Sequence, residues 1–509
     1  MQFHTDRPRG TVPNATIRTH ESTEKTMITE ALHDTATDIR SIQERIDRVF
    51  AAQSANRLSV AATDAKARVK KLKAILHWIN GNRQKIYDAL YADFQKPPPE
   101  SDLTEIYYVT TEIKHAIQHL QDWMRAKPVS PTLAYLSTRA ELRYEPKGQV
   151  LIIAPWNFPF NLTIGPLVSA IAAGNCVIVK PSEYTPNTTA LIRDMLAELF
   201  PENEIAVFQG AAEVSQALLA KPFHHIFFTG SPEVGKIVMK AAAEHLSTVT
   251  LELGGKSPVI VDESANVSDA AAKIAWGKWT NNGQTCIAPD YLMVHEKVYD
   301  GFLAGLKQNI EKFYGATEED RRNSPDYGRV ASTRHHARMK QMLDDSVNMG
   351  ANVFIGGKMD ADARYLAPTV LTDVPPNAPV LQEEIFGPLL PVIKIKNLDE
   401  AIDRINAGEK PLAMYVFSRT SKNIGRSLDQ TSAGTTCVND CLIQYLHPNL
   451  PFGGVNNSGH GNSHGYFGFK AFSHERAVLR HNALAPMKLM YPPYTNFVKR
   501  IIGLVTRYF

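Results

Sequence analysis

The sequence predicts an α/β protein with a doubly wound, Rossmann-like sheet domain, followed by a second α/β domain and a small β element. From Val150 onward, short continuous apolar runs alternate with helical stretches, and a second such series begins at Ser257. Apolar runs of this kind are typical of parallel strands that are buried on both faces, with helices crossing over between them. The 509 residues, of which 44% are hydrophobic, are enough for a large core and two or three domains.

Helices are expected before the first sheet. Residues 1–38 are rich in Thr, Arg, Glu and His and poor in aromatic residues, so we expect a flexible N-terminal arm or a leader there. Over residues 39–94, apolar residues recur at helical spacing, which indicates helices that end at Pro97. A further helix is expected over 103–123.

A hairpin is expected between these helices and the sheet. Residues 137–144 alternate loosely between apolar and polar, residues 145–148 are typical of a turn, and 149–153 are a strand. The free edge of such a hairpin can pair with another subunit.

The strand–helix alternation of the first sheet can be followed along the sequence. Strands are predicted over residues 150–154, 176–180, 205–208, 225–228 and 248–253. Helices are predicted between them over residues 163–173, 188–199, 213–220 and 232–245. Ligands of doubly wound sheets bind at the carboxyl ends of the strands, so the residues that follow each strand are site candidates.

The first two of these strands are followed by Asn157 and Lys180. Prolines on both sides fix the backbone around Asn157, whose amide is an uncharged donor suited to a developing oxyanion. The alternative is a proline turn capped by Asn157. Lys180 ends an apolar strand, which suits a lysine that reaches ribose hydroxyls or a phosphate; a lysine that extends its charge into solvent is the alternative.

The fourth and fifth strands are followed by glycines. Gly230, Ser231 and Gly235 open a predicted helix, where Gly230 permits a tight turn and free N–H groups favour a pyrophosphate. Glu252 lies in an apolar strand and precedes Gly254. Burial raises the pKa of such a carboxyl, which suits a general base. A salt-bridged structural glutamate is the alternative.

One cysteine, Cys286, lies in a loop of small and polar residues after a predicted helix over 268–279. A thiol in such a loop is expected to be partly exposed and deprotonated, the state in which cysteine is a nucleophile. A buried structural cysteine is the alternative.

Composition excludes several classes of function. A net charge of +3 does not indicate a nucleic-acid partner. The four cysteines are too few and too scattered for a disulfide framework, so we expect a reducing compartment such as the cytoplasm. No metal site is expected, because neither Cys437, Cys441 and His447 nor the pair His115 and His119 has a further ligand. No apolar run reaches the length of about 18 residues that indicates a transmembrane helix.

The second α/β series contains an acidic pair, Glu383 and Glu384, directly before Ile385 and Phe386. A glycine-dense loop over 451–461 is expected to close over a substrate pocket or to pack at a subunit contact.

The last residues, 496–509, are predicted to form an amphipathic helix, too short to span a bilayer. Three interpretations of this helix remain open. It docks on its own subunit or on a partner, lies on a membrane surface, or caps a substrate funnel.

Together, Asn157, Lys180, the Gly230–Gly235 turn, Glu252, Cys286 and Glu384 resemble the NAD(P)-dependent aldehyde dehydrogenase superfamily. The most specific motif is Leu-Glu-Leu-Gly-Gly-Lys-Ser-Pro followed by Asn-Asn-Gly-Gln-Thr-Cys, and the resemblance extends from Asp47 to Leu479. Within that superfamily, the Pro-Phe-Gly-Gly-Val loop and the later Phe-Ser-His are similar to the class 3 group, which handles fatty and aromatic aldehydes. Asn456 departs from the glycine usual in that loop.

The resemblance implies a mechanism and a cofactor site. Cys286 attacks an aldehyde, Asn157 and the Cys286 N–H hold the oxyanion, and Glu252 activates the water that hydrolyses a thioester. NAD is the implied cofactor, with NADP as an option that Glu183 can oppose or accommodate. The implied cofactor residues are Trp156, Lys180, Glu183, Gly230, Ser231, Gly235, Leu253, Gly254, Glu384 and Phe386, with a ribose each for Lys180 and Glu384.

The resemblance also implies a division of the chain and a homodimer. Residues 39–130 and 150–252 would bind NAD(P), and residues 253–439 would carry the thiol. Residues 131–149 and 440–480 would form the oligomerisation element, and 481–509 a tail that can contact a membrane peripherally.

Two other functions stay open. A coenzyme-A-acylating dehydrogenase would share the fold and the thiol, but such enzymes typically lack a glutamate at the Glu252 position. A cofactor-independent thiol esterase would need only Cys286 and a base.

Overall fold

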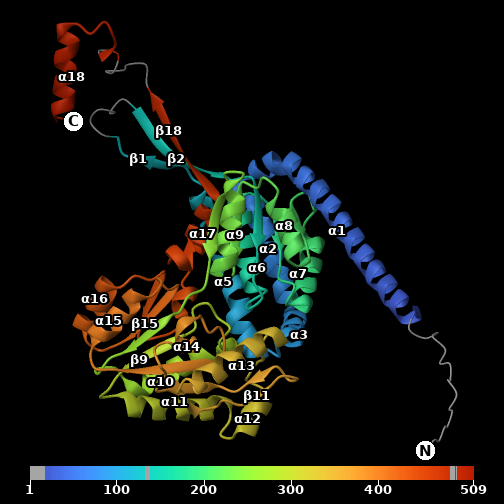
Figure 1. Ribbon diagram of the computed structural model, residues 1–509. Coiled ribbons are helices and arrows are strands. Elements are labelled where there is room, and N and C mark those ends of the chain that lie inside the picture. The colour runs from blue at the N-terminus through green and yellow to red at the C-terminus, as the bar shows by residue number, and fades with distance from the viewer. Residues whose placement is uncertain (1–17, 132–137, 482–487, 489, 509) are drawn as a thin grey trace, which may run out of the picture.

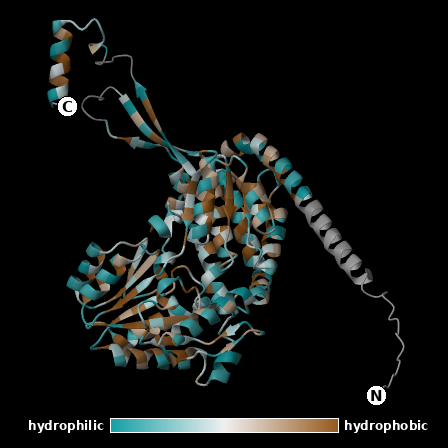
Figure 2. Ribbon diagram, in the orientation of Figure 1, coloured by the Kyte–Doolittle hydropathy of each residue, from teal (hydrophilic) through white to brown (hydrophobic). Residues whose placement is uncertain are grey.

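The computed structural model describes residues 18–131, 138–481, 488 and 490–508, with side chains described from residue 40 onward. The chain forms two α/β lobes from which a long N-terminal helix, a small sheet and a C-terminal helix extend (Figure 1). Hydrophobic residues concentrate on the strands and inner helix faces of both lobes (Figure 2).

The first lobe is built on a six-stranded sheet in the order β17-β7-β6-β3-β4-β5. Neighbouring residues of β3 face different cores, with Val150 and Ile152 in one and Leu151 and Ile153 in the other. The sheet is therefore covered on both faces, as its continuous apolar strands predict. The parallel strands are β3 (Gln149–Ile153), β4 (Cys176–Lys180), β5 (Ile205–Val207), β6 (His225–Thr229) and β7 (Thr248–Glu252), and β17 (Gly459–His460) is antiparallel to β7.

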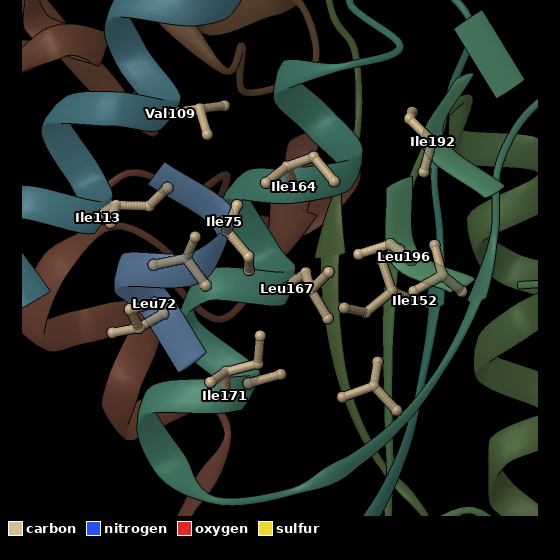
Figure 3. Packing of buried hydrophobic residues seen from close by; sticks show 14 of the residues in the cluster. Leu72, Ile75, Val109, Ile113, Ile152, Ile164, Leu167, Ile171, Ile192 and Leu196 are labelled. Atoms are coloured by element: carbon tan, nitrogen blue, oxygen red, sulfur yellow. The ribbon is translucent and has the colours of Figure 1, made fainter. Parts of the chain in front are cut away.

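Helices cover both faces of this sheet. Figure 3 shows apolar side chains such as Leu72, Ile113 and Leu167 converging from three helices on the interior that also holds Ile152. This face is covered by α2 (Ala65–Gly81), α3 (Arg83–Phe94), α5 (Tyr107–Trp123), α6 (Asn161–Ala173) and α7 (Pro186–Leu199). The other face is covered by the end of α1 with α8 (Ala212–Leu219) and α9 (Pro232–Ala243).

Helix α1 (Arg18–Ala61) begins earlier than expected. Of the predicted flexible arm, residues 1–17 lie outside the described residues, whereas the chain is helical from Arg18 over 44 residues. Neither Gly nor Pro occurs between Arg18 and Ala61, so no residue interrupts the helix once it has formed. Its first part extends away from the lobe (Figure 1).

The prolines expected to end the N-terminal helical region also begin the next helix. Pro98 and Pro99 lie in the first turn of α4 (Pro98–Ser101), where a missing N–H costs nothing. A π-helical turn, η1 (Asp102–Ile106), then continues into α5.

The second lobe contains a seven-stranded sheet in the order β10-β13-β14-β9-β8-β15-β16. Its strands are β8 (Pro258–Val261), β9 (Tyr291–His295), β10 (Asn352–Ile355), β13 (Thr369–Thr372), β14 (Leu389–Ile395), β15 (Ala413–Phe417) and β16 (Thr435–Val438). Its helices are α10 (Val267–Trp279), α11 (Tyr299–Tyr314), α12 (Glu318–Asn323), α13 (Thr333–Asn348), α14 (Pro379–Gln382), α15 (Leu398–Ala407) and α16 (Ser421–Gln430), beside the pair β11 (Met359–Asp360) and β12 (Tyr365–Leu366). Seven of these elements were not predicted from the sequence: β9, β11, β12, β16, α12, α14 and α16.

The expected hairpin is wrong in its pairing. Strand β2 (Thr138–Pro146) continues through the predicted turn and pairs with β1 (Lys127–Val129) and, from Pro146 to Thr138, with β18 (Ser473–His481). Strand β3 enters the six-stranded sheet instead. Residues 147–148 therefore carry the chain from one sheet to another, and the protruding sheet has the order β1-β2-β18.

The segment before β18 lies against the body of the protein. It includes the short helical turns η4 (Ile443–Leu446) and η5 (Asn456–Ser458), the strand β17, and α17 (Gly465–Ala471). Phe469 and Phe472 belong to the core of the first lobe.

The expected C-terminal helix is present as α18 (Asn496–Tyr508), beyond the protruding sheet and apart from both lobes (Figure 1). Phe497 is 66% exposed, Leu504 59% and Tyr508 68%. Among the helices in the described part of the chain, none combines the length and apolarity needed to cross a bilayer.

Candidate active site

A cavity of about 1280 Å³ opens at the carboxyl ends of β3, β6 and β7, between the two lobes. It brings together most of the predicted site residues: Trp156, Asn157, Gly230, Ser231, Glu252, Leu253, Gly254, Cys286, Glu384 and Phe386. Lys180, Glu183 and Gly235 are not among its lining residues.

Cys286 follows α10 and a short turn, η3 (Thr280–Gly283). Asn281 and Asn282 in this turn have φ values of 53° and 57°, a left-handed conformation that Asn tolerates better than most residues. The Tyr415 hydroxyl donates to the Ile287 carbonyl at 2.6 Å and so fixes the loop just after the thiol.

The Cys286 thiol is half-buried, and its ionisation differs from the expected one. Burial raises the pKa of the thiol far above its ordinary value, and the nearby Glu384 and Glu252 carboxyls raise it further. The expectation of a deprotonated thiol is therefore wrong for this state. A base has to remove the proton before the sulfur can act as a nucleophile.

Asn157 is buried and tied to the cysteine loop. Its Nδ2 donates to the Gln284 carbonyl at 3.0 Å, and Nδ2 of Asn281 donates to the carbonyls of Asn157 at 2.8 Å and Gln284 at 3.1 Å. The Asn281 N–H in turn donates to the Glu100 carboxylate at 2.9 Å. The two lobes thus hold the amide and the thiol loop in one network, to which Glu100 and Gln284 contribute without having been predicted.

Glu252 ends β7 and is only 6% exposed. Its Oε1 accepts a hydrogen bond from the Ser463 hydroxyl at 2.9 Å, whereas its Oε2 is buried without a partner. Burial raises the pKa of Glu252 to about 8, and the Ser463 hydrogen bond opposes that rise. The structural alternative, a salt bridge, is not seen for this carboxylate among the described residues.

The Glu384 carboxyl packs against Gly254, and both residues line the cavity. A Cβ at position 254 would come within 2.1 Å of Glu384 Oε2, so only glycine leaves room for this carboxyl. Burial, with Asp290 nearby, raises the pKa of Glu384 to about 8, and its Oε1 is buried without a partner. An unpaired carboxylate oxygen beside a glycine fits a group that offers hydroxyl donors, such as ribose.

Helix α13 positions the Glu384–Phe386 segment, a role that the sequence did not indicate. Arg338 donates to the Ile385 carbonyl at 2.9 Å and to the Glu384 carbonyl at 2.6 Å. Burial lowers the pKa of His335 to about 4, so its neutral ring can donate to the Phe386 carbonyl, 2.7 Å from Nε2. Phe386 makes an edge contact with Trp156 at a centroid distance of 5.3 Å.

The N-terminus of α9 is suited to bind a phosphate group. Ser231 caps this helix, accepting the Val234 N–H at 3.4 Å, and Ser231 and Gly230 line the cavity. Gly235 lets α9 approach β7 closely, because a Cβ there would lie 2.7 Å from the Leu253 side chain. Free N–H groups at such a helix start attract anions.

Lys180 and Glu183 form an ion pair, with Nζ 2.7 Å from Oε2, at the carboxyl end of β4. The lysine is 3% exposed, so it does not extend into solvent.

A second, smaller cavity of about 30 Å³ shares Cys286 and Glu252 with the large one. Its other lining residues are mainly aromatic or small, among them Tyr108, Phe227, Tyr445, Phe452, His464 and Phe472. These residues come from α5, from β6 and from several turns between β16 and β18, and local sequence pattern does not connect them.

Comparisons with known proteins agree with this geometry. Residues 14–478 match the aldehyde dehydrogenase family. The chain is 44% identical over 438 residues to aldehyde dehydrogenase family 3 member B2 of Mus musculus, covering 86% of this chain and 90% of that protein. It is 43% identical over 428 residues to the dimeric NADP-preferring aldehyde dehydrogenase of Rattus norvegicus, covering 84% and 93%.

A solved structure of the substrate-bound state of Staphylococcus aureus AldH is also similar, with a TM-score of 0.87 at 41% identity, over 90% of this chain and 99% of that one. The expected fold and family are therefore confirmed. The chain belongs to the aldehyde dehydrogenase family and is an NAD(P)-dependent oxidoreductase of aldehydes.

Proposed function

We propose that this protein oxidises apolar aldehydes, aliphatic of medium or long chain or aromatic, to carboxylates through a thioester on Cys286. The observation that carries the proposal is that Cys286 and Glu252 line both the large cavity and the small aromatic one. Their position between a cofactor-sized space and an apolar one supports the roles of nucleophile for Cys286 and base for Glu252.

In the first step, Glu252 takes the thiol proton as the aldehyde binds, because the raised pKa of Cys286 keeps the thiol protonated at neutral pH. The sulfur bonds to the carbonyl carbon, and the carbonyl electron pair moves to the oxygen. The Asn157 amide and the Cys286 N–H hold this oxyanion. An amide carries two hydrogens, and one of those of Asn157 is used for Gln284.

In the second step, the electron pair on the oxyanion re-forms the C=O bond as the hydride leaves this carbon, which gives the thioester; bound NAD(P)+ would supply the hydride acceptor. Glu252, having released its first proton to solvent, takes a proton from a water molecule. The water oxygen bonds to the thioester carbon, and the C–S bond breaks. The carboxylate leaves, and Cys286 regains a proton.

We assign the cofactor NAD, with NADP as the alternative, to the large cavity. Gly230 and Ser231 would bind the pyrophosphate and Glu384 one ribose. Lys180, paired with Glu183 at the carboxyl end of β4 and outside the lining of the cavity, would reach the other ribose from the side. Trp156, Phe386, Leu253 and Gly254 would border the nicotinamide end, and Gly235 allows α9 its position.

We propose an apolar aldehyde because aromatic side chains surround the thiol on its far side. Tyr445 and Phe452 make an edge contact at a centroid distance of 4.9 Å in this wall. Such a wall stabilises an alkyl or aryl group through burial of apolar surface.

We also propose a homodimer that forms through the protruding sheet, and a peripheral contact of α18 with a membrane surface as one of its three roles. The name of the rat relative describes a dimer, which supports the first of these proposals. The exposed apolar residues of α18, with Lys499, Arg500 and Arg507 beside them, support the second.

Replacement of the nucleophile and of the base separates the steps. In Cys286→Ala, aldehyde oxidation is expected to be lost while the cofactor still binds. In Glu252→Gln, both proton transfers lose their base, but hydrolysis should slow more than acylation, so a slower burst of reduced cofactor should remain. Steady-state turnover should fall by roughly 10² or more, since general bases contribute about 10²–10⁴. Stopped-flow absorbance of reduced cofactor with hexanal measures the loss of oxidation, the burst and the turnover. Fluorescence titration measures whether Cys286→Ala still binds the cofactor.

The reaction products decide between the rival functions. Formation of acyl-coenzyme A from hexanal, NAD+ and coenzyme A would favour an acylating enzyme. Ester hydrolysis without any production of reduced cofactor from aldehydes would favour a thiol esterase. Parental turnover by Glu252→Gln would remove Glu252 from the mechanism.

A further inference from the structure

Ser463 is the polar group that holds Glu252. Its Oγ lies 2.9 Å from Glu252 Oε1, and both residues are buried. Among the described residues no other side chain makes a hydrogen bond to this carboxylate, and Oε2 has no partner. The two carboxylate oxygens therefore differ in their contacts. Oε1 accepts a hydrogen bond from Ser463, and Oε2 is left to accept a proton from a water molecule or a thiol.

The backbone of Ser463 is itself fixed by hydrogen bonds to Phe452. It forms a β-bridge with Phe452, in which the Ser463 N–H donates to the Phe452 carbonyl at 2.7 Å. The hydroxyl also lies 3.2 Å from that carbonyl oxygen. The next residue, His464, has a φ of 73° and stacks on the Phe452 ring with an interplanar angle of 9°.

Helix α5 fixes the backbone two residues after Ser463. The Gly465 N–H donates to the Glu112 carboxylate at 2.8 Å, across 353 positions of sequence. Because residues 463–465 are held at both ends, the Ser463 hydroxyl has a defined position relative to Glu252.

The groups around Glu252 are uncharged or remote. Burial raises the pKa of the Cys286 thiol and of the Tyr108 phenol, so both are neutral at physiological pH. Burial lowers the pKa of His464 to about 3, so its ring is neutral too. Adjacent strands present Thr229 and Gly459, which have no charge.

Two other carboxyls lie in this region. Glu112, whose pKa burial raises to about 7, contacts Gly465 instead of Glu252. Glu384, whose pKa burial raises to about 8, lines the same large cavity as Glu252. The ionisation of Glu252 therefore depends on burial, which opposes it, and on the Ser463 hydroxyl, which favours it.

We propose that Ser463 is the positioning residue for the base of this enzyme, holding Oε1 of Glu252 so that Oε2 takes the proton of the hydrolytic water. The inference rests on the proposed role of Glu252. A hydroxyl has one hydrogen. While the carboxylate is ionised, that hydrogen points to Oε1; once Oε2 is protonated, Oε1 accepts less strongly and the hydrogen can turn to the Phe452 carbonyl.

The test is the pH dependence of thioester hydrolysis. Steady-state turnover of hexanal with NAD+ is measured from pH 6 to about 10 in the parent, Ser463→Ala, Ser463→Thr and Glu252→Gln. In the parent, turnover should rise with pH through about 8, because only the ionised carboxylate accepts a proton. In Ser463→Ala this rise should move to higher pH by about one to two pH units, since a hydrogen bond to a charged group is lost.

Two further readouts separate this role from a merely structural one. The burst of reduced cofactor should keep its amplitude in Ser463→Ala, which shows that the variant is folded and acylates. Ser463→Thr keeps the hydroxyl and should return the midpoint toward the parental one.

An unshifted midpoint in Ser463→Ala, with a reduced rate at every pH, would overturn the proposal for Ser463 and leave Glu252 as the base. Parental turnover in Glu252→Gln would instead overturn the proposed function on which it rests. The two failures are thus distinguishable in one set of measurements.

Discussion

Gly254 lies just after β7 of the first sheet and Glu384 lies just before β14 of the second, and each restricts the other. The carboxyl of Glu384 occupies the space that a side chain at position 254 would need. The resemblance to the family had placed both residues at the cofactor without indicating that they touch.

Gly254→Ala should displace Glu384 and weaken cofactor binding. A Cβ 2.1 Å from Oε2 cannot be accommodated without moving the carboxyl. If one hydrogen bond between that carboxylate and the cofactor is lost, KM for NAD+ should rise about tenfold or more, since such a bond is worth about 1.5–3 kcal/mol.

The measurement is steady-state kinetics at varied NAD+, supported by fluorescence titration of cofactor binding. Gly425→Ala is the matched control, because a Cβ there meets no atom within 4 Å. An unchanged KM in Gly254→Ala would contradict a cofactor role for Glu384.

Local pattern predicted the residues at strand ends but not the contacts between them. Asn157 and Glu252 could be found because each follows or ends an apolar run, which marks the edge of a parallel sheet. Ser463 could not, because 211 positions separate it from Glu252. The Cys286 side chain is partly exposed, as its small polar neighbours indicated, but burial and two carboxyls from distant parts of the chain raise the pKa of its thiol, which local pattern could not show.

Elements differ in how strongly their own sequence specifies them. The strands of the first sheet carry continuous apolar runs, and all five parallel ones were predicted to within a few residues. Strand β2 and its turn were misassigned, because Pro-Lys-Gly marks a bend equally well within a hairpin and between two sheets. Helix α16 was missed because its ten residues include a glycine and mostly polar side chains.

The C-terminal helix α18 should influence the choice of substrate. Its exposed apolar residues offer a surface for an alkyl chain. Deletion of residues 496–509 is expected to lower kcat/KM for hexadecanal relative to hexanal by about tenfold, the value of roughly two buried methylene groups.

Both rates are measured on the deleted and full-length proteins with the same detergent and cofactor. An unchanged ratio would remove the helix from substrate selection. Co-sedimentation of the full-length protein with anionic phospholipid vesicles, lost on deletion, would assign the helix to a membrane surface instead.

At the scale of the whole molecule, β18 is an edge strand of the protruding sheet, and over residues 473–480 no strand of the described residues pairs with its outer side. Unpaired strand edges favour pairing with another chain. Light scattering should therefore give the parent a mass about twice 56.5 kDa.

Proline scanning tests whether that edge forms the dimer. Ala477→Pro and Val478→Pro are made separately, because N–H groups of adjacent residues in an antiparallel strand point to opposite sides. In one of the two variants, proline removes a backbone N–H that points away from β2 toward the outer side of β18. That variant should be monomeric, and its melting temperature should equal that of the parent. A monomeric parent, or dimers in both folded variants, would place the interface elsewhere.

Strand β17 is encoded late yet completes the edge of the first sheet, pairing with β7 beside Glu252. A nascent chain that ends before residue 459 has an open sheet edge and no hydroxyl to hold its carboxylate. During translation Cys286 therefore leaves the ribosome before the residue that makes the hydrogen bond to Glu252 has been added. On the proposed mechanism, premature termination upstream of β17 would yield a protein that holds Cys286 but lacks the contact that positions Glu252 for release of the acyl group.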